Sequence, residues 1–557
     1  MSGFDETFDF VVVGSGGGSM CAALVVRSAG KSAVVLEKTA LIGGTTARSG
    51  GVMWIPNNRF MARDGVPDSF AQATAYLDAV VGTPNNAPGT SALRRHTYLV
   101  NGPEMVDYLV GQGIRLNRVD YWPDYNDELP GGSEKGRTVV AELFNVNELG
   151  AWKSKLRPNF IAMMSTLDEM LKLRFINKSW EARKIAAKVV LRTIGAKLTG
   201  KHYVTAGAAL QGRMLQAALK AGVEFLTDTP VTELVVEEGA VRGIVTQREG
   251  KPRRIGARLG VLVNAGGFAK NQAMRAQYQP HTNANWSLAA EGDTGELIRE
   301  MMRHGAAIAQ MEEMVGNQIA IPPGMEDAAI KPVVQGVAAA PHAILVDQTG
   351  VRYMNEGGSY MTFCQGMIKR QETAPAVPSW AIMDQQFMKQ YMLAGTMPGS
   401  KKPASWFDSG FLKKAETIEE LAGLMAIDPA MLRATVDRFN GFVAKNHDDD
   451  FGRGERAYDR WLGDKFHPRN ASLGSIAQGP FYAMQVLPGD VGTYGGVVTD
   501  ASARVLREDG SAIKGLYATG VSTASSMGRA YPGAGASVGP SFVWGYVAAK
   551  HALSSQN

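Results

Sequence analysis

Residues 8–38 read FDFVVVGSGGGSMCAALVVRSAGKSAVVLEK, and this stretch decides the fold that the sequence predicts. Residues 10–13 are a short β-branched run, typical of a strand buried in a parallel sheet. A glycine-rich turn follows, and then a helix whose apolar positions run through Cys21, Leu24 and Val25. Residues 32–37 predict a second strand. Strand, glycine turn, helix and strand in this order indicate a Rossmann βαβ unit.

The glycines and the acidic residue of this stretch are spaced for a dinucleotide. Gly14, Gly16 and Gly18 open the helix, so its N-terminal N–H groups are free to bind a pyrophosphate. Glu37 ends the second strand, 23 residues after Gly14, where a carboxylate binds ribose hydroxyls. Ser19 replaces the third glycine of G-x-G-x-x-G, and it is small enough for the helix to pack on the strand. The stretch therefore predicts a dinucleotide site.

The chain carries three further glycine-rich strand ends, which favour FAD over a nicotinamide cofactor. Residues 42–51 (IGGTTARSGG) follow the second strand, whereas residues 261–271 (VLVNAGGFAKN) and 515–520 (GLYATG) lie far along the chain. An elongated cofactor needs close backbone approaches from several segments, and glycine permits them. The Glu37 carboxylate repels a 2′-phosphate and so excludes NADP. No second G-x-G-x-x-G unit for a nicotinamide is visible.

We therefore predict an FAD-binding domain that is discontinuous in sequence. The residues expected to contact FAD are Gly14, Ser15, Gly16, Gly18, Ser19, Glu37, Lys38, Gly43, Gly44, Thr45, Thr46, Ser49, Gly50, Gly51, Ala265, Gly266, Gly267, Gly520, Gly535, Ser537 and Val538.

Length and cysteine content limit the class of protein. A chain of 557 residues is longer than one core usually fills, so two or three domains are expected. Cys21 and Cys364 leave no disulfide framework, and no Cys/His cluster has metal-ligand spacing, so we expect no metal. The acidic start and the lack of an apolar run of about 18 residues argue against export and membrane spanning. A cytoplasmic protein is expected.

The middle of the chain leaves the flavin pattern and returns to it. We expect residues 1–318 to form the first part of an α/β FAD-binding domain and residues 492–557 the second part. Residues 319–491 mix strands and helices, and they are expected to form an inserted α+β cap domain that carries catalytic residues. The substrate pocket is then expected at the seam between the two domains.

Residues 151–201 are a strongly basic insertion in the first part. They contain 12 Lys or Arg and 3 Asp or Glu, a local net charge of +9. A helix starting at about Ser179 places one apolar face on Trp180, Ala187, Leu191, Ile194 and Leu198, and another row on Glu181, Lys184, Lys188 and Arg192. Basic amphipathic helices with an aromatic residue lie in membrane interfaces, which predicts peripheral attachment to the inner face of the cell membrane.

An ordinary solvated helix that packs on the body is the alternative for this insertion. Nucleic-acid binding is excluded, because the sequence carries no recognition motif.

Residues 528–539 (GRAYPGAGASVG) raise a separate question, because a tyrosine and a bare glycine backbone lie four residues apart. Together with VVVGSGGGS, VLEKTALIGGTTARSGG, RYMNE and VVTDASARVLREDGSAIKGLYATG, they make the chain resemble the 3-ketosteroid Δ1-dehydrogenases. That family is related to fumarate reductase flavoproteins, and the resemblance covers nearly the whole chain except the basic insertion.

The resemblance implies an active site of three tyrosines and a glycine amide. The family's Pro-Asp-Tyr tyrosine falls on Tyr125, its Tyr-Pro-Gly-x-Gly motif on Tyr531 and Gly535, and the tyrosine after its Arg-aromatic-x-Asn-Glu motif on Tyr360. Many members have two adjacent tyrosines where this chain has Tyr125-Asn126, so only the first is carried over.

The implied reaction is the 1,2-dehydrogenation of a 3-ketosteroid in steroid catabolism. Tyr360 is the expected base for the proton of carbon 2, and Tyr125 shares its charge. The Tyr531 hydroxyl and the Gly535 N–H are the expected donors to the ketone oxygen, where enolate charge develops. Flavin N5 takes the hydride of carbon 1, and a quinone or another acceptor then reoxidises the flavin.

Three other functions stay open at this point. One is a 3-ketosteroid Δ4-(5α)-dehydrogenase, and another is a fumarate reductase-like flavoprotein that would clamp two carboxylates with residues such as His342 and Arg352. The third is a flavin-binding protein without catalytic activity.

Overall fold

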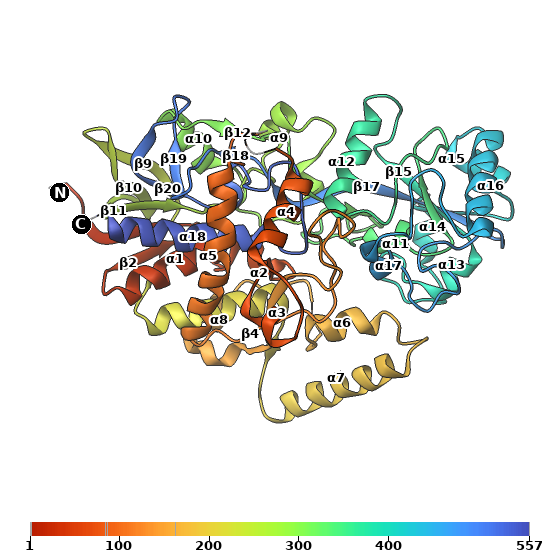
Figure 1. The fold of residues 1–557 in the computed structure, drawn as a ribbon, viewed down its shortest axis with the longest axis horizontal. Helices are drawn as coiled ribbons and strands as arrows, with labels where there is room; N and C mark the ends of the chain where they lie inside the picture. Colours follow the sequence, from red (N-terminus) through yellow and green to blue (C-terminus); the bar gives the residue numbers. More distant parts are fainter. Residues whose placement is uncertain (1–2, 84, 86, 162, 556–557) are drawn as a thin grey trace.

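The computed structural model describes residues 3–83, 85, 87–161 and 163–555. Figure 1 shows two bodies side by side. Both ends of the chain lie in the first body, and helices α11 to α17 surround the second. Helix α7 stands away from both along the lower edge of the view.

An eight-stranded sheet forms the centre of the first body, in the order β19-β20-β10-β11-β1-β2-β8, with β9 paired to β10. Strand β1 runs parallel to β2 on one side and to β11 on the other. The predicted βαβ unit is confirmed as β1, α1 and β2. The strands of this sheet are β1 Glu6–Val13, β2 Ala33–Leu36, β8 Glu224–Leu226, β9 Val231–Glu237, β10 Ala240–Arg248, β11 Lys251–Val263, β19 Arg504–Leu506 and β20 Ala512–Ala518.

A second sheet of five strands forms the centre of the other body, in the order β13-β17-β15-β14, with β16 paired to β17. We keep residues 1–318, 319–491 and 492–557 as a proposed domain division, and this second sheet spans residues 314–493. Its strands are β13 Met314–Ile319, β14 Ala343–Val346, β15 Ser379–Met383, β16 Leu412–Ala415 and β17 Phe481–Thr493.

Smaller strands and the helices complete the two bodies. A three-stranded sheet consists of β3 Val52–Trp54, β4 Leu116–Arg118 and β5 Thr138–Ala141, and two further pairs are β6 Phe144–Asn145 with β7 Tyr203–Val204 and β12 Ile308–Ala309 with β18 Gly496–Val497. The α-helices are α1 Gly17–Ser28, α2 Gly44–Arg48, α3 Arg59–Arg63, α4 Phe70–Val81, α5 Ala92–Gly111, α6 Leu167–Leu173, α7 Trp180–Leu198, α8 Ala206–Lys220, α9 Gln272–Tyr278, α10 Glu296–Arg303, α11 Gln335–Ala339, α12 Tyr360–Gln371, α13 Gln385–Gln390, α14 Ala404–Asp408, α15 Ile418–Met425, α16 Pro429–Lys445, α17 Ala457–Leu462 and α18 Val538–Ser554.

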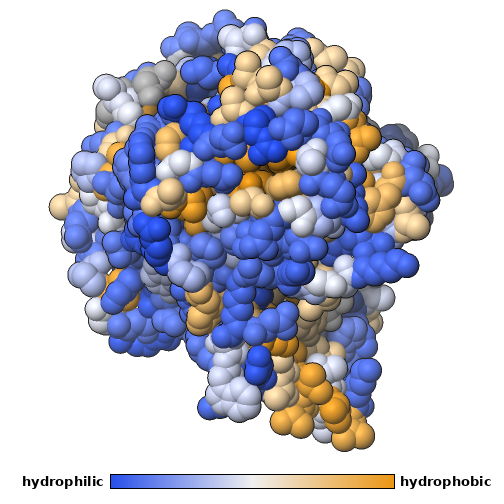
Figure 2. All heavy atoms as spheres, turned by 90° about the vertical axis from the view of Figure 1, so that its right-hand side faces the viewer, coloured by the Kyte–Doolittle hydropathy of each residue, from blue (hydrophilic) through white to orange (hydrophobic). Residues whose placement is uncertain are grey.

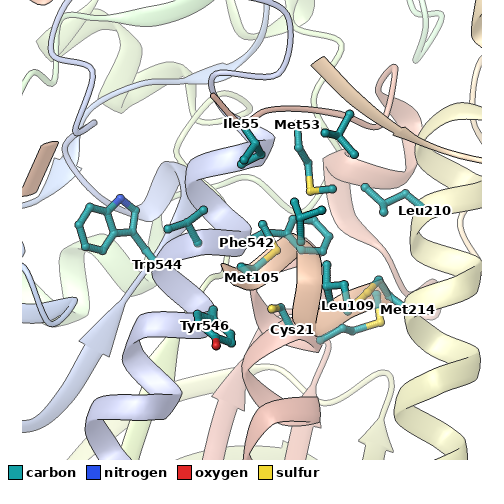
Figure 3. Packing of buried hydrophobic residues seen from close by; sticks show 14 of the residues in the cluster. Cys21, Met53, Ile55, Met105, Leu109, Leu210, Met214, Phe542, Trp544 and Tyr546 are labelled. Atoms are coloured by element: carbon teal, nitrogen blue, oxygen red, sulfur yellow. The ribbon is translucent and has the colours of Figure 1, made fainter. Parts of the chain in front are cut away.

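Glycines let the last helix, α18, pack tightly against α1. A Cβ atom added at Gly18 would lie 2.2 Å from the Ser541 carbonyl oxygen, and one at Gly545 would lie 2.2 Å from the Gly18 carbonyl oxygen. Around this contact, Figure 3 shows buried side chains from α1, α5, α8 and α18, among them Cys21, Leu109 and Phe542. The C-terminal segment is therefore part of the core of the first body. Because the first body contains the predicted FAD-binding unit, we call it the FAD-binding body, and we call the second body the cap body.

Helices α6 and α7 form a projection, which we define as residues 163–201. The predicted start of α7 is confirmed, because Ser179 Oγ accepts a hydrogen bond from Ala182 N. Two members of the predicted Glu181–Arg192 row form ion pairs with Glu169 of α6. Arg192 is largely covered by this contact, whereas Lys188 stays exposed to solvent. Within the described residues, no helix combines the length and apolarity that crossing a bilayer requires.

Candidate active site

A cavity of about 1980 Å³ runs from the carboxyl ends of β1 and β2 to the seam between the two bodies. Most of the predicted FAD contacts line it: Gly14, Ser15, Gly16, Glu37, Lys38, Gly44, Thr45, Thr46, Ser49, Gly50, Gly51, Ala265, Gly266, Gly520, Gly535, Ser537 and Val538. Segments from four parts of the chain thus meet along one cavity, as an elongated cofactor requires.

Four of the predicted FAD contacts lie outside the lining. Gly18 packs against α18, and Ser19 Oγ is hydrogen-bonded to the Asn264 side chain at 3.0 Å. Gly43 N donates to Ser15 Oγ at 2.9 Å, and a Cβ at Gly267 would lie 1.8 Å from the Thr493 hydroxyl oxygen. These four residues do not contact the cavity; they pack against or hydrogen-bond to the segments that form its wall.

The residues at the βαβ end of the cavity fit a dinucleotide. Gly16 precedes α1, whose first turn contains no acidic residue, so its free N–H groups suit an anion. Glu37 is buried, and its carboxylate accepts hydrogen bonds from Ser15 Oγ at 2.6 Å and Thr39 N at 2.9 Å. A Cβ at Gly14 would lie 2.2 Å from the Asn264 carbonyl oxygen, so the turn needs glycine.

Two further residues line the FAD side of the cavity and were not predicted. Asp293 is buried, and this burial raises the pKa of its carboxyl group to about 7, although Thr45 Oγ1 donates to it at 3.1 Å. The polar stretch EGDTGE at residues 291–296 is the signal that marks it. Arg157 was placed in the basic insertion, but its backbone pairs with Ile42 and its side chain lines the cavity.

The structure brings the three predicted tyrosines together at the seam. Their ring centroids are 5.3 Å apart for Tyr125 and Tyr360, 5.2 Å for Tyr360 and Tyr531, and 5.9 Å for Tyr125 and Tyr531. All three line the cavity. The Tyr125 hydroxyl is buried and has no hydrogen-bond partner in the described part of the chain, which leaves it available to a ligand or a neighbouring phenol.

Local contacts explain why these tyrosines converge. Tyr360 is the first residue of α12, after the N-cap Ser359. Tyr125 N donates to the Pro532 carbonyl oxygen at 2.9 Å, which joins the Tyr125 loop to the loop after Tyr531. The buried Tyr76 hydroxyl donates to the same oxygen at 2.6 Å.

Burial keeps all three phenols protonated at neutral pH. It raises the pKa of Tyr531 to about 12, and it raises the pKa values of Tyr360 and Tyr125 well above the ordinary value. For Tyr360 the charges of Tyr125 and Tyr531 add to the effect of burial. A base at Tyr360 must therefore work from a small deprotonated fraction.

Gly535 occupies a backbone position that only glycine fits. Its φ is +96°, and a Cβ there would lie 2.4 Å from the Val52 carbonyl oxygen and 2.7 Å from Trp54 N. Its carbonyl accepts from Trp54 N and Gly539 N, whereas its N–H has no acceptor among the described residues. A backbone donor is thus left at the cavity wall near Tyr531.

A fourth tyrosine, Tyr458 of α17, was not predicted. Its ring centroid lies 4.5 Å from that of Tyr125, and its hydroxyl accepts from Gln335 Nε2 at 2.8 Å. The sequence around it, AYDRW, carries no signal that could have found it.

Comparison with known proteins identifies the family. Residues 9–538 match the FAD binding domain family. The chain is 38% identical to a 3-oxosteroid 1-dehydrogenase of Mycolicibacterium smegmatis, over 98% of this chain and 97% of the relative. The chain belongs to the 3-oxosteroid 1-dehydrogenase family. It is an FAD-dependent oxidoreductase that acts on CH–CH bonds.

A solved member of this 3-oxosteroid 1-dehydrogenase family has the same fold. The 3-ketosteroid Δ1-dehydrogenase of Sterolibacterium denitrificans, in complex with 1,4-androstadiene-3,17-dione, superposes with a TM-score of 0.90 at 33% identity and covers 99% of this chain and 100% of its own. A 4-oxocyclohexanecarboxylate 2-dehydrogenase of Sinomonas cyclohexanicum is 32% identical over 98% of this chain and 92% of the relative.

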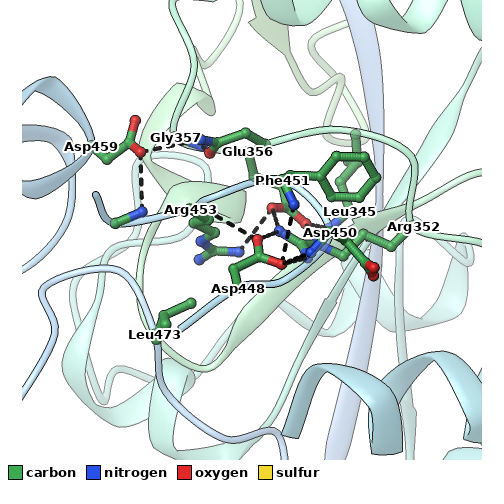
Figure 4. Close-up of polar contacts among 12 residues, drawn as sticks. Leu345, Arg352, Glu356, Gly357, Asp448, Asp450, Phe451, Arg453, Asp459 and Leu473 are labelled. Carbon is green, nitrogen blue, oxygen red and sulfur yellow. Dashed lines mark hydrogen bonds and ion pairs between the residues drawn. The ribbon is translucent and has the colours of Figure 1, made fainter. Parts of the chain in front are cut away.

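The family's Arg-aromatic-x-Asn-Glu motif forms a buried ion cluster in the cap body (Figure 4). The Arg352 guanidinium donates to the Glu356 carboxylate and to the Asp448 carboxylate, at 2.6–2.9 Å. Arg453 forms a further ion pair with Glu356 at 3.2 Å. This motif therefore anchors the turn that leads into α12 and Tyr360.

The end of the cavity away from the βαβ unit is apolar. Its apolar wall consists of Phe160 and of residues from the projection and the cap body: Met163, Leu167, Met170, Leu171, Phe175, Ile330, Val334, Met392 and Leu462. Such a lining suits a large hydrophobic ligand whose one polar end reaches the tyrosines.

Proposed function

We propose that this enzyme removes hydrogen from carbons 1 and 2 of a 3-ketosteroid to give the Δ1-3-ketosteroid. The observation that carries the proposal is the convergence of Tyr125, Tyr360, Tyr531 and the unpaired Gly535 N–H on the cavity. Two donors at one end of the site suit the ketone oxygen, and a third phenol suits the removal of a neighbouring proton.

The chain's own residues then act at two places on the substrate, the ketone oxygen and the proton of carbon 2. The Tyr531 hydroxyl and the Gly535 N–H donate to the ketone oxygen and stabilise the charge that develops as carbon 2 loses its proton. The Tyr360 phenolate takes that proton, and the Tyr125 hydroxyl supports the phenolate. FAD, held along the loops of residues 14–18, 42–51 and 264–267, supplies the acceptor for the hydride of carbon 1. The product is the Δ1-3-ketosteroid, which is a cross-conjugated dienone when the substrate already has a double bond between carbons 4 and 5.

Competing functions are supported less well. For a fumarate reductase-like reaction, Arg352 is bound to Glu356 and Asp448, and His342 Nδ1 lies 2.8 Å from the Ser475 carbonyl oxygen. Neither lines the cavity. For a single-ring keto acid, most of the apolar wall would stay unfilled. The Tyr-Pro-Gly-x-Gly arrangement favours the carbon-1 reaction over the Δ4-(5α) reaction.

One assay tests this function. Anaerobic addition of a 3-ketosteroid such as 4-androstene-3,17-dione should bleach the flavin absorbance, and the product should have lost two hydrogens and gained the ultraviolet spectrum of a cross-conjugated dienone. 4-Oxocyclohexanecarboxylate is the control substrate and should bleach the flavin only slowly. The proposal would be contradicted if only the keto acid bleached the flavin. It would also be contradicted if only a saturated steroid reacted and its product had gained a double bond between carbons 4 and 5.

We propose further that the projection attaches the enzyme to the inner face of a membrane. Its helix α7 exposes five large apolar side chains: Trp180 by 68%, Val190 by 56%, Leu191 by 69%, Ile194 by 50% and Leu198 by 82%. Figure 2 shows hydrophobic side chains gathered at the lower tip of the molecule, where the projection lies. An apolar patch of this kind marks a surface that another phase or molecule covers.

A bilayer is the occupant that the charges favour. Arg183, Lys184, Lys197 and Lys201 are exposed on the same projection. Each Lys or Arg near anionic lipid contributes about 1 kcal/mol, and burial of apolar surface adds about 25 cal/mol per Å². The projection also lines the apolar end of the cavity. Steroids partition into lipid, so this site would receive them, and quinone acceptors, from the bilayer.

Sedimentation with anionic liposomes tests the attachment. Wild-type enzyme should sediment at low salt and less at high salt, because salt screens only the ionic part. Lys184→Glu, Lys197→Glu and Lys201→Glu combined should release it and spare turnover of solubilised steroid. Lys188 and Arg192 are left unchanged, since they pair with Glu169. Reversal of Lys369, Lys401 and Lys414 on the cap is the matched control. A wild type that stays in solution at low salt would refute the attachment.

A further inference from the structure

The loop that carries Tyr125 is tied to the rest of the FAD-binding body at successive residues. Asp124 accepts from Trp54 Nε1 at 2.8 Å and forms an ion pair with Arg137 at 2.5 Å. Tyr125 N donates to the Pro532 carbonyl oxygen, and Asn126 N donates to the Tyr76 hydroxyl at 3.2 Å. These contacts fix the loop relative to Tyr531.

The next residue, Asp127, crosses the seam to the cap body. Its two carboxylate oxygens accept hydrogen bonds from Ala457 N and Tyr458 N, each at 2.9 Å. These are the first two residues of α17, and Arg456 at the N-cap position makes no side-chain cap of its own. A residue 330 positions earlier thus supplies the cap of this helix.

From α17 the polar contacts continue to Tyr360. Asp459 Oδ2 accepts from Asn355 Nδ2 at 3.1 Å, and Asn355 Oδ1 accepts from Gly357 N at 2.7 Å. Figure 4 shows Asp459 beside the turn at Gly357. Gly357 lies three residues before Tyr360 in the turn that opens α12. We call the set Asp127, α17, Asp459, Asn355 and Gly357 the seam strap.

The two sides of the seam carry different parts of the proposed chemistry. Tyr125, Tyr531 and Gly535 belong to the FAD-binding body, whereas Tyr360 belongs to the cap body. Proton removal and stabilisation of the ketone oxygen act on neighbouring atoms of one substrate, so their groups need a fixed separation. A misplacement of about 1 Å at such a site costs about 10²-fold in rate.

We propose that Asp127 is a positioning residue which, through the seam strap, sets the place of Tyr360 relative to Tyr125 and Tyr531. Other contacts of α17 across the seam include the ring of Tyr458, whose centroid lies 4.5 Å from that of Tyr125. At the far end of α17, Trp461 Nε1 donates to the Tyr121 carbonyl oxygen at 2.9 Å and Trp461 stacks on Trp122. Asp127 alone joins the start of α17 to the Tyr125 loop among the hydrogen bonds of the described residues. This role rests on the proposed function.

The test uses the FAD-loaded enzyme and the variants Asp127→Ala and Asp127→Asn. The neighbouring Glu128→Gln is the matched control, because Glu128 is exposed and its side chain does not cap α17. In Asp127→Ala, the rate of flavin bleaching per bound FAD at saturating steroid should fall about tenfold or more, while KM changes less than about threefold. Asp127→Asn keeps one acceptor and should recover part of the rate.

Hydrogen–deuterium exchange supplies a readout that does not depend on activity. Amides in residues 457–462 and 355–360 should exchange faster in Asp127→Ala, and those of α7 should not change. If exchange rises only at residues 457–458, or the bleaching rate per FAD equals that of wild type, Asp127 is a local cap and the proposal is wrong. If none of the ketosteroids tested bleaches the flavin of the wild-type enzyme, the proposed function is wrong. Exchange at residues 355–360 then still decides whether the seam strap exists.

Discussion

Replacing Tyr360 or Tyr531 with phenylalanine is expected to lower kcat by about 10² or more while FAD stays bound. The two hydroxyls have separate tasks in the proposed reaction, proton removal and donation to the ketone oxygen. The two rings pack against each other, with centroids 5.2 Å apart. Phenylalanine keeps the ring and removes only the hydroxyl oxygen, so this packing is preserved. Steady-state turnover at saturating ketosteroid, divided by flavin content, measures the effect.

The pH dependence separates the two roles. Burial and the charges of Tyr125 and Tyr531 raise the pKa of Tyr360, so its reactive phenolate becomes more abundant as pH increases. The wild-type kcat should therefore rise from about pH 7 to pH 9 without a plateau. Tyr531→Phe should keep this rise, and Tyr360→Phe should lose it.

A third tyrosine provides the control. Tyr353 is partly buried in the cap body and its hydroxyl hydrogen-bonds to Ser379 Oγ at 2.7 Å, but it does not line the cavity. Tyr353→Phe should leave turnover within about twofold of wild type. Near wild-type turnover in Tyr360→Phe or Tyr531→Phe would remove that residue from its proposed role.

Gly535→Ala is expected to cause a loss of similar size, about 10² or more in kcat. The added Cβ would lie 2.4 Å from the Val52 carbonyl oxygen, and the φ of +96° is unfavourable for alanine. The backbone must shift, and the N–H that is proposed to donate to the ketone oxygen shifts with it. Rapid-mixing measurement of flavin bleaching isolates this step from reoxidation.

Gly510→Ala is the matched control for backbone strain. Gly510 has a φ of +81° and no atom within 4 Å of an added Cβ, so the substitution costs only the strain of the left-handed backbone. Both variants should have a lower melting temperature than wild type, but only Gly535→Ala should show slower bleaching of the flavin. If the two variants bleach equally fast, the Gly535 N–H is not a donor in the reaction.

Local patterns explain what could be predicted from the sequence. Gly14, Gly16 and Glu37 lie within one βαβ unit, where sequence spacing translates directly into position. The place of Tyr125, Tyr360 and Tyr531 was predictable only through the resemblance to a family. By themselves, they are three aromatic residues in three separate segments.

Contacts between distant segments explain what could not be predicted. Tyr458 meets Tyr125, and Asp127 meets the start of α17, only when the cap body packs on the FAD-binding body. Asp127 and Ala457 are 330 positions apart along the chain. Arg192 was predicted in a row with Glu181, Lys184 and Lys188, and the sequence did not show that α6 folds back beside α7 and pairs Arg192 with Glu169. A helical pattern gives the face of a residue but not the element that covers that face.

The placement of Tyr360 on one body and of Tyr531 and Gly535 on the other has a consequence for protein engineering. Exchanging the cap between two members of the family would transfer the proposed base and leave the proposed ketone donors behind. If Asp127 has the proposed positioning role, a chimera needs a recipient loop with an acceptor for the start of α17, as Asp127 provides here. Altered specificity is therefore more readily sought in the apolar wall than by shuffling whole domains.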